Sequence, residues 1–113
     1  MKLIVAVVLP ENLEAVQTAI TPLGAQVISV SRVLGGGLDP DYTEIYRGRT
    51  VHARRPQIRL EVAADDASAE SVVQAILREG AADGENDAEV LVMQLAGSVR
   101  TRARDHGPVV ACM

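Results

Sequence analysis

Leu3-Ile4-Val5-Ala6-Val7-Val8-Leu9 is an unbroken apolar run, and Pro10 ends it. Such a run is typical of a β-strand that is buried on both of its faces. Pro10 suits the first turn of a helix, and apolar residues then recur at helical spacing, so residues 11–20 are expected to form an amphipathic helix. The chain therefore begins with a buried strand that leads directly into a helix.

Three further stretches outward from this unit are expected to be strands. They are residues 26–34, rich in Val, Ile and Ser, residues 57–62, which alternate strictly between apolar and polar, and residues 89–95. Strict alternation marks a half-buried strand. Residues 99–103 can add a short fifth strand near the end of the chain.

A second helix is expected between the third and fourth strands. Residues 69–77 carry an apolar stripe at helical spacing, Asp65 or Asp66 can cap its start, and Gly80 ends it. The resulting order over residues 1–113 is β-α-β-β-α-β. This order predicts a single α+β domain with the ferredoxin-like fold, an antiparallel sheet with two helices on one face.

A long loop is expected between the second and third strands, over about residues 37–55. This stretch holds Pro40, is rich in charge and shows no sustained apolar period. Loops of this length are uncommon in compact domains, and they are commonly functional or disordered.

The second face of the sheet has no helix to cover it. Strand residues are apolar at nearly every position, notably Val90-Leu91-Val92-Met93, while the two helices suffice for one face only. We therefore expect another subunit to cover the second face, in an oligomer.

Composition and charge limit the partners that the chain can have. It has 113 residues, of which 48% are hydrophobic, and a net charge of −4. Nucleic-acid binding needs a broad basic footprint, so no nucleic-acid partner is expected. The charge is uneven, because acids dominate residues 61–89 and arginines residues 47–59. This separation sets up either opposed local fields or two solvated faces.

The reactive side chains argue against metal binding and catalysis. Cys112 is the single cysteine, so neither an intrachain disulfide nor a CxxC metal pair is possible. His52 and His106 have no partner at metal-ligand spacing, and Ser29 and Ser31 have no adjacent base. The apolar start is followed at once by acids and is shorter than a membrane span. We expect a cytoplasmic protein without a metal, a cofactor or catalytic residues.

Two clusters can hold an anion. Gly35-Gly36-Gly37 follows the second strand and either lets the backbone approach a ligand closely or serves as a flexible hinge. It does not match the GxGxxG dinucleotide fingerprint, because it opens a loop and not a helix. The second cluster is Arg100, Arg102 and Arg104, which are spaced to share one face of the possible fifth strand, where they either clamp a phosphate or form a solvated edge.

Over nearly its whole length the chain resembles the PII signalling family. The matching stretches occur in the family's order and at near-constant spacing. The strongest match is Thr43-Glu44-Ile45-Tyr46-Arg47-Gly48, which corresponds to the root of the family's long T-loop. The other matches are Pro10, Leu13 and Val16 of the first strand and helix, Gly35 and Gly37, Pro56 to Val62, and the pair Arg100 and Arg102.

The resemblance implies a homotrimer that binds adenine nucleotides between subunits and reports the bound state to a membrane transporter or metabolic enzyme through the T-loop. The implied nucleotide site comprises Ser29, Gly35, Gly36, Gly37, Leu38, Glu61, Val62, Ala63, Arg100 and Arg102. The implied partner-binding loop comprises Tyr42, Glu44, Tyr46, Arg47, Arg49, His52, Arg54 and Arg55. Of these, the tip is expected to carry Arg49, His52, Arg54 and Arg55. The tail begins at about residue 104 and runs to 113.

The chain departs from the family where phosphates are held. The family's phosphate loop carries two lysines, whereas residues 82–89 here are acidic and Glu89 replaces the second lysine. A carboxylate near a phosphate is repulsive by about a few kcal/mol at a partly shielded site. Asp39 stands where the family has the Gln that helps to hold magnesium and 2-oxoglutarate. We therefore expect AMP or ADP to bind, or another small anion, but not MgATP with 2-oxoglutarate.

Three alternatives keep the same fold. One is a ligand-independent interaction module whose nucleotide site has decayed, and another is a canonical nitrogen-regulatory PII protein. A third alternative, an acyl-phosphate hydrolase, needs an Arg in the loop after the first strand, and residues 9–12 contain none. The chain is therefore not expected to be an enzyme.

Overall fold

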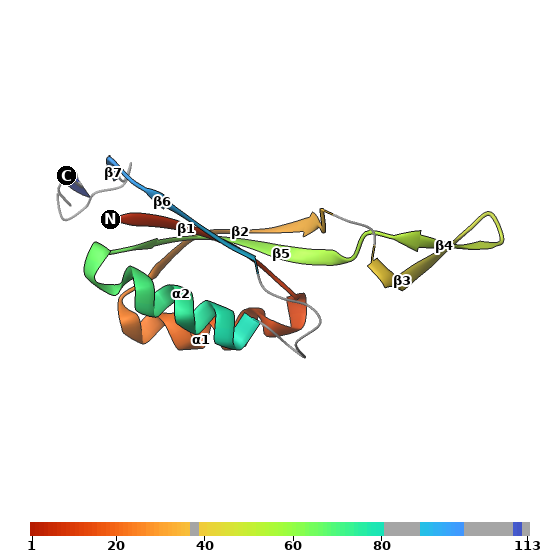
Figure 1. The fold of residues 1–113 in the computed structure, drawn as a ribbon, viewed down its shortest axis with the longest axis horizontal. Coiled ribbons are helices and arrows are strands. Elements are labelled where there is room, and N and C mark those ends of the chain that lie inside the picture. Colours follow the sequence, from red (N-terminus) through yellow and green to blue (C-terminus); the bar gives the residue numbers. More distant parts are fainter. Residues whose placement is uncertain (37–38, 81–88, 99–109, 112–113) are drawn as a thin grey trace.

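The computed structural model describes residues 1–36, 39–80, 89–98 and 110–111, and it shows a compact body from which a hairpin projects (Figure 1). In chain order the elements are β1 (Lys2–Val8), the 3-10 helix η1 (Pro10–Asn12), α1 (Leu13–Ile20), the 3-10 helix η2 (Thr21–Leu23), β2 (Gln26–Leu34), β3 (Asp39–Tyr46), β4 (Arg49–Ala53), β5 (Pro56–Ala64), α2 (Asp66–Gly80), β6 (Glu89–Gln94), β7 (Gly97–Ser98) and β8 (Val110–Ala111). The projecting hairpin makes the molecule long and narrow, with extents of 57 × 28 × 22 Å.

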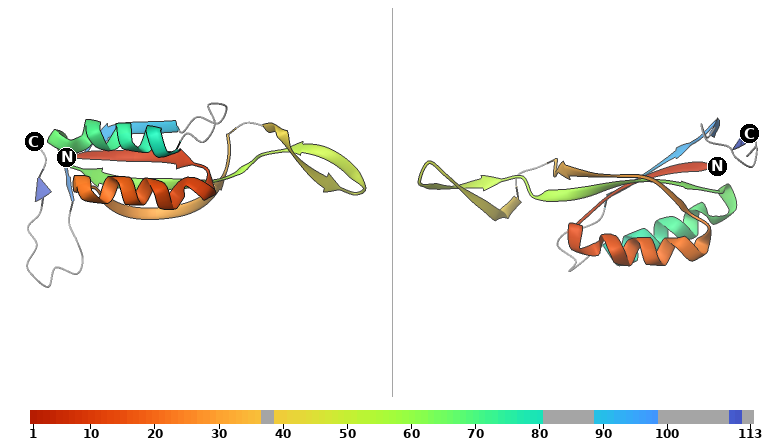
Figure 2. Two further views of the ribbon diagram at one scale, coloured as in Figure 1. Left: turned by 90° about the horizontal axis from the view of Figure 1, so that it is seen from below. Right: turned by 180° about the vertical axis from the view of Figure 1, so that it is seen from behind.

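Four strands form the main sheet, in the order β2-β5-β1-β6. β5 and β1 pair antiparallel with each other, and each pairs antiparallel with its outer neighbour. α1 connects β1 to β2, α2 connects β5 to β6, and both helices lie on the same face of the sheet (Figure 2). The ferredoxin-like fold predicted from the sequence is confirmed.

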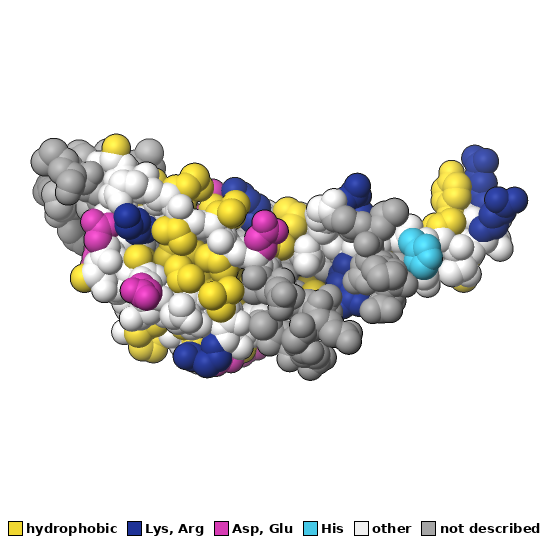
Figure 3. Space-filling view, viewed as in Figure 1, with side chains coloured by type: hydrophobic (Ala, Val, Ile, Leu, Met, Phe, Trp, Pro, Cys, Tyr) yellow, Lys and Arg dark blue, Asp and Glu magenta, His cyan; other side chains and the backbone are white. Residues whose placement is uncertain are grey.

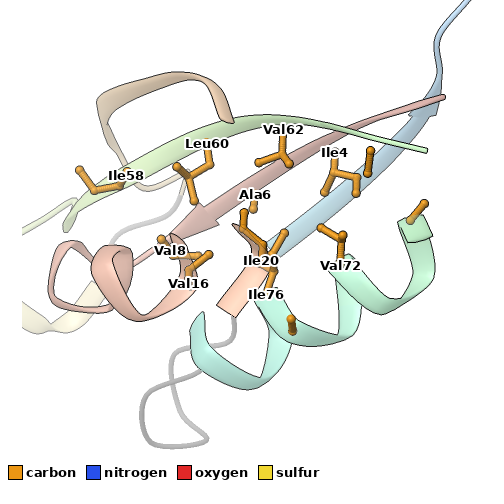
Figure 4. Packing of buried hydrophobic residues seen from close by; sticks show 13 residues of the cluster. Ile4, Ala6, Val8, Val16, Ile20, Ile58, Leu60, Val62, Val72 and Ile76 are labelled. Carbon is orange, nitrogen blue, oxygen red and sulfur yellow. The ribbon is translucent and has the colours of Figure 1, made fainter. Parts of the chain in front are cut away.

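The hydrophobic core fills the space between this face and the two helices (Figure 4). β5 alternates as its sequence predicts, and Ile58, Leu60 and Val62 point into the core. The buried side chains that meet them from β1, α1 and α2 are Ile4, Ala6, Val8, Val16, Ile20, Val72 and Ile76. Every one of these positions is aliphatic, in agreement with a sequence that contains no Phe or Trp.

In the described part of the chain, no helix covers the opposite face of the sheet. On this face Leu3 pairs with Met93 and Val5 pairs with Leu91, so its β1–β6 half is apolar. Leu91 is 54% exposed and Met93 is 47% exposed. The sequence predicts that β1 is buried on both faces. In the single chain only the face toward the helices is completely buried. That another subunit covers the opposite face stays a prediction.

The prediction of an irregular loop over residues 37–55 is wrong in its local structure. β3 and β4 pair as an antiparallel hairpin that extends away from the main sheet (Figure 1). Every side chain from Thr43 to His52 is exposed. An apolar period arises when one face of a strand is buried, so a hairpin exposed on both faces gives no such signal.

The first helix, α1, ends at Ile20 as expected, and Leu23 falls in η2, where it is 37% exposed. Pro22 accounts for the end of α1, because its missing N–H cannot continue the α-helical hydrogen bonds. The start of the helix differs from expectation, because residues 10–12 form η1. The pairing of β7 with β8 was not predicted. The expected fifth strand over 99–103 and the loop over 81–87 fall outside the described residues.

Candidate functional site

The candidate site centres on the junction where β2 ends and the hairpin begins. The Gly35 N–H donates to the Arg55 carbonyl at 2.9 Å. The Arg54 guanidinium turns back toward the same segment, and its Nη1 donates to the Gly35 carbonyl at 3.1 Å and also to the Gly36 carbonyl. The expectation that Arg54 and Arg55 lie at the tip is wrong, because both lie at the base of the hairpin.

The two described glycines of the triplet have different surroundings. A Cβ on Gly35 would lie 2.9 Å from Gln57 Oε1 and 3.4 Å from the Arg55 carbonyl oxygen, so Gly35 lets two chain segments approach each other closely. A Cβ on Gly36 would meet no described atom within 4 Å. Gly35 therefore serves the packing of the junction, whereas the side of Gly36 where a Cβ would lie has space for a ligand to approach.

A second group of predicted site residues lies along the exposed face of β2 and β5. Ser29 pairs with Glu61 across the two strands, and the Ser29 hydroxyl donates to Glu61 Oε1. The same carboxylate oxygen lies 3.5 Å from Arg59 Nη1. This row of polar side chains gives the β2–β5 half of the face a hydrogen-bonding surface, beside the apolar β1–β6 half.

The backbone next to this cluster is irregular. The β2–β5 register shifts between Val27 and Ser29, so Ile28 is an extra residue on β2. Such a bulge interrupts the ladder and leaves backbone groups available, and bulges are common beside functional sites. Val62 is fully buried toward the helices, so only its backbone can contact a ligand on the other face. Ala63 follows on that other face and is partly exposed.

The two halves of the predicted nucleotide site lie apart within one chain. Ser29 and Gly35 are six positions apart along extended chain, which corresponds to roughly 20 Å. The remaining predicted contacts lie outside the described residues, and they are Gly37, Leu38, Arg100 and Arg102.

The tip of the hairpin is a two-residue turn at Arg47-Gly48. Both residues have positive φ, 51° and 76°, as in the tight turns that match the twist of paired strands. The Arg47 guanidinium lies over the Tyr46 ring, 5.4 Å from its centroid. Ile45 is 81% exposed, and Figure 3 shows basic side chains beside hydrophobic ones at this far end. The family-like stretch 43–48 thus forms the outer part of β3 and the turn, which corrects its expected place at the root.

The other residues of the predicted partner-binding loop lie on the two faces of the hairpin. Tyr46 pairs with Arg49 and Glu44 pairs with Val51, so these four share one face. His52 pairs with Thr43 on the other face. The side chain of Tyr42 is outside the described set.

One ion pair outside this site shifts a pKa. Asp66, in the first turn of α2, accepts a hydrogen bond from the Met1 ammonium at 2.8 Å. This hydrogen bond, together with the charges of the Met1 ammonium and Lys2, lowers the pKa of the Asp66 carboxyl from its usual value. The pair fastens the first strand to the start of α2.

The described residues hold no cluster of three His, Cys, Asp or Glu side chains placed to bind a metal ion. None of its helices is long and apolar enough to cross a membrane. An open groove of about 520 Å³ runs between α1 and α2, and it is lined by Ala19, Leu23, Ala67, Glu70, Ser71, Gln74, Ala75 and Arg78. This groove contains none of the site residues predicted from the sequence.

Comparison with known proteins identifies the family. The family model for nitrogen regulatory protein P-II matches residues 1–105. The chain is 32% identical over 108 residues to the nitrogen regulatory protein P-II of Cereibacter sphaeroides, covering 95% of this chain and 96% of that protein. It is 30% identical over 112 residues to the nitrogen regulatory protein GlnK1 of Methanosarcina mazei, covering 96% and 95%. The resemblance seen in the sequence is confirmed, and the chain belongs to the P-II family of nitrogen regulatory proteins.

Proposed function

We propose that the chain is a trimeric P-II regulator that binds AMP or ADP between its subunits and controls a transporter or metabolic enzyme through the β3–β4 hairpin. The junction of Gly35 and Gly36 with Arg54 and Arg55 carries this proposal. The open side of Gly36 and the guanidinium of Arg54 suit an anion, and the same residues hold the base of the hairpin. Binding at this junction can therefore alter the hairpin directly.

The exposed face of the sheet has an apolar β1–β6 half and a polar β2–β5 half, and this division supports a trimer. Leu91 and Met93 of β6 lie beside Leu3 and Val5 of β1, and a surface of this kind is typical of contacts between subunits. A second chain placed over this face would bring its own residues toward the polar β2–β5 half. A nucleotide bound there would then contact two chains, which fits a site whose halves lie apart within one chain.

The negative charge of Glu89 favours binding of a nucleotide with one or two phosphates over ATP. Glu89 is the first residue of β6, is exposed and pairs with Val7. It stands where the family carries a lysine, so it repels the outer phosphates of ATP where the family attracts them. AMP and ADP bring less negative charge to this position.

The Ser29–Glu61–Arg59 cluster suits binding better than catalysis. Glu61 accepts a hydrogen bond from Ser29 and lies 3.5 Å from Arg59 Nη1, so its carboxylate is engaged in contacts that can orient a ligand. The proposed role of this cluster is to contact the nucleoside part of the ligand. The proposed place of action is the cytoplasm, where adenine nucleotides and their metabolic targets occur.

Isothermal titration calorimetry with AMP, ADP, ATP and 2-oxoglutarate tests the ligand. We expect tighter binding of AMP or ADP than of ATP. Glu89→Lys should raise the affinity for ATP about tenfold or more, because it exchanges repulsion for attraction. Glu70→Lys makes the same charge change on α2 and should leave the affinities unchanged. Absence of heat with every nucleotide at millimolar concentration would overturn the nucleotide part and favour a ligand-independent interaction module.

A further inference from the structure

The hairpin is joined to the body by two short connections of unequal length. The last β2–β5 pair is Leu34 with Pro56, and the first β3–β4 pair is Asp39 with Ala53. Between these pairs the chain has four residues on one side, 35–38, and two on the other, 54–55. The main sheet and the hairpin are consequently separate sheets, and the contacts at this junction decide how firmly one is held to the other.

Arg54 supplies side-chain contacts across this junction. It follows β4, and its Nη1 reaches the carbonyls of Gly35 and Gly36, which follow β2. The Gly35 N–H to Arg55 carbonyl bond is the neighbouring backbone link. Arg54 is exposed, so its guanidinium is accessible to a ligand in solution.

The acceptors that Arg54 uses are weaker than an anion would be. A hydrogen bond from a guanidinium to a phosphate is charge-assisted on both sides, whereas a carbonyl is neutral. A phosphate group beside the Gly36 backbone would therefore compete with the two carbonyls for Arg54. The guanidinium fork also matches the geometry of phosphate oxygens, which a lysine ammonium does not.

We propose that Arg54 is a latch that holds the hairpin to the end of β2 and that transfers to a phosphate of the bound nucleotide. This inference rests on the proposed function for the ligand and adds the residue that couples the ligand to the hairpin. In the ligand-free chain Arg54 bonds to the Gly35 and Gly36 carbonyls and restrains the junction. When nucleotide binds, Arg54 bonds to the phosphate, the carbonyls are released, and the hairpin moves more freely against the body.

The test combines amide hydrogen exchange with ADP titration, on the wild-type chain and on Arg54→Ala. Without ligand, exchange of the Gly35 amide, which donates to the Arg55 carbonyl at the junction, should be several-fold faster in Arg54→Ala, because the latch is absent. ADP should speed this exchange in the wild type and leave Arg54→Ala unchanged. The affinity for ADP should fall about tenfold in Arg54→Ala, as expected for the loss of a charge-assisted hydrogen bond.

Two further variants separate the latch from a general effect of charge. Arg78→Ala removes an exposed arginine from the last turn of α2, outside the junction, and should match the wild type in exchange and in ADP affinity. Arg54→Lys keeps the charge without the fork and should fall between the wild type and Arg54→Ala. Circular dichroism of each variant checks that the body remains folded.

The ligand-free and ligand-bound measurements test the restraint and the transfer separately. Equal exchange of Arg54→Ala and the wild type without ligand overturns the latch. Equal ADP affinity in the two chains overturns the transfer to phosphate. If the wild type binds no ADP, the proposed ligand and the transfer both fail, and the ligand-free exchange still decides whether Arg54 restrains the hairpin.

Discussion

Substitution of Leu91 tests whether a second copy covers the open face of the sheet. Leu91 lies on β6 opposite Val5 and is 54% exposed in the single chain. Burying a whole Leu side chain is worth about 2 kcal/mol, so covering the exposed half adds about 1 kcal/mol per subunit. Three copies give about 3 kcal/mol, and Leu91→Ala should lower the association constant of a trimer about a hundredfold. Leu91→Asp should have a larger effect, because each copy then buries a carboxylate at a cost of about several kcal/mol.

Sedimentation velocity over a range of micromolar concentrations measures this effect. We expect a trimer for the wild type, a concentration-dependent mixture for Leu91→Ala and a monomer for Leu91→Asp. Ile45→Asp is the matched control, because it makes the same kind of change on the hairpin, where the side chain is 81% exposed. The reasoning is refuted if Leu91→Asp sediments like the wild type, or if Ile45→Asp dissociates the oligomer as strongly. A monomeric wild type would refute it as well.

Two further predictions concern the stability of the body. Ile76→Ala should lower the free energy of unfolding by about 3 kcal/mol, since Ile76 is fully buried between α2 and the sheet, while Leu77→Ala, at a partly exposed neighbour, should cost about 1 kcal/mol or less. Urea unfolding measures both, and equal losses would contradict the packing described. The Asp66 carboxyl has its pKa lowered by the Met1 ammonium, so its stabilisation is present above its unfolded pKa, about 4, and is lost as the pH falls through the folded value. The melting temperature of the wild type should therefore exceed that of Asp66→Asn at neutral pH, and the gap should close in acid; a gap that is constant with pH would refute the assignment.

The sequence predicts the body of the fold well because each element there buries one face. Alternate residues of β1 and of β5 face the helices, and they include Ile4, Ala6 and Val8 in β1 and Ile58, Leu60 and Val62 in β5. The hairpin has no such pattern, because its side chains are exposed on both faces. The signal that could have found it is the turn. Arg47-Gly48 lies between two stretches with Thr, Ile, Tyr and Val, and a Gly at the second turn position favours a two-residue hairpin.

The sequence predicts part of the candidate site. It marks Gly35 and Gly36 as places where an anion can approach, but it assigns Arg54 and Arg55 to the partner-binding loop, and the structure brings these four residues together. Arg100 and Arg102, the predicted phosphate contacts, lie outside the described residues. Spacing along the chain could not place Arg54, because its neighbours depend on where the hairpin strands end. β4 ends at Ala53, so Arg54 falls at the base.

The arginines of the hairpin therefore divide into two groups with different physical tasks. Arg47 and Arg49 lie at the far end, beside exposed hydrophobic side chains, where they can meet a partner that carries acidic and apolar groups. Arg54 and Arg55 lie at the junction, where they contact Gly35 and Gly36 and where the proposed anion would compete for Arg54. The paired strands of β3 and β4 connect the two groups. A change of bonding at the base can thus alter the position of the tip without any contact between ligand and partner, provided that the hairpin moves as one unit. Hydrogen exchange that rises at the junction but leaves the cross-strand bonds of the hairpin protected would identify this kind of motion.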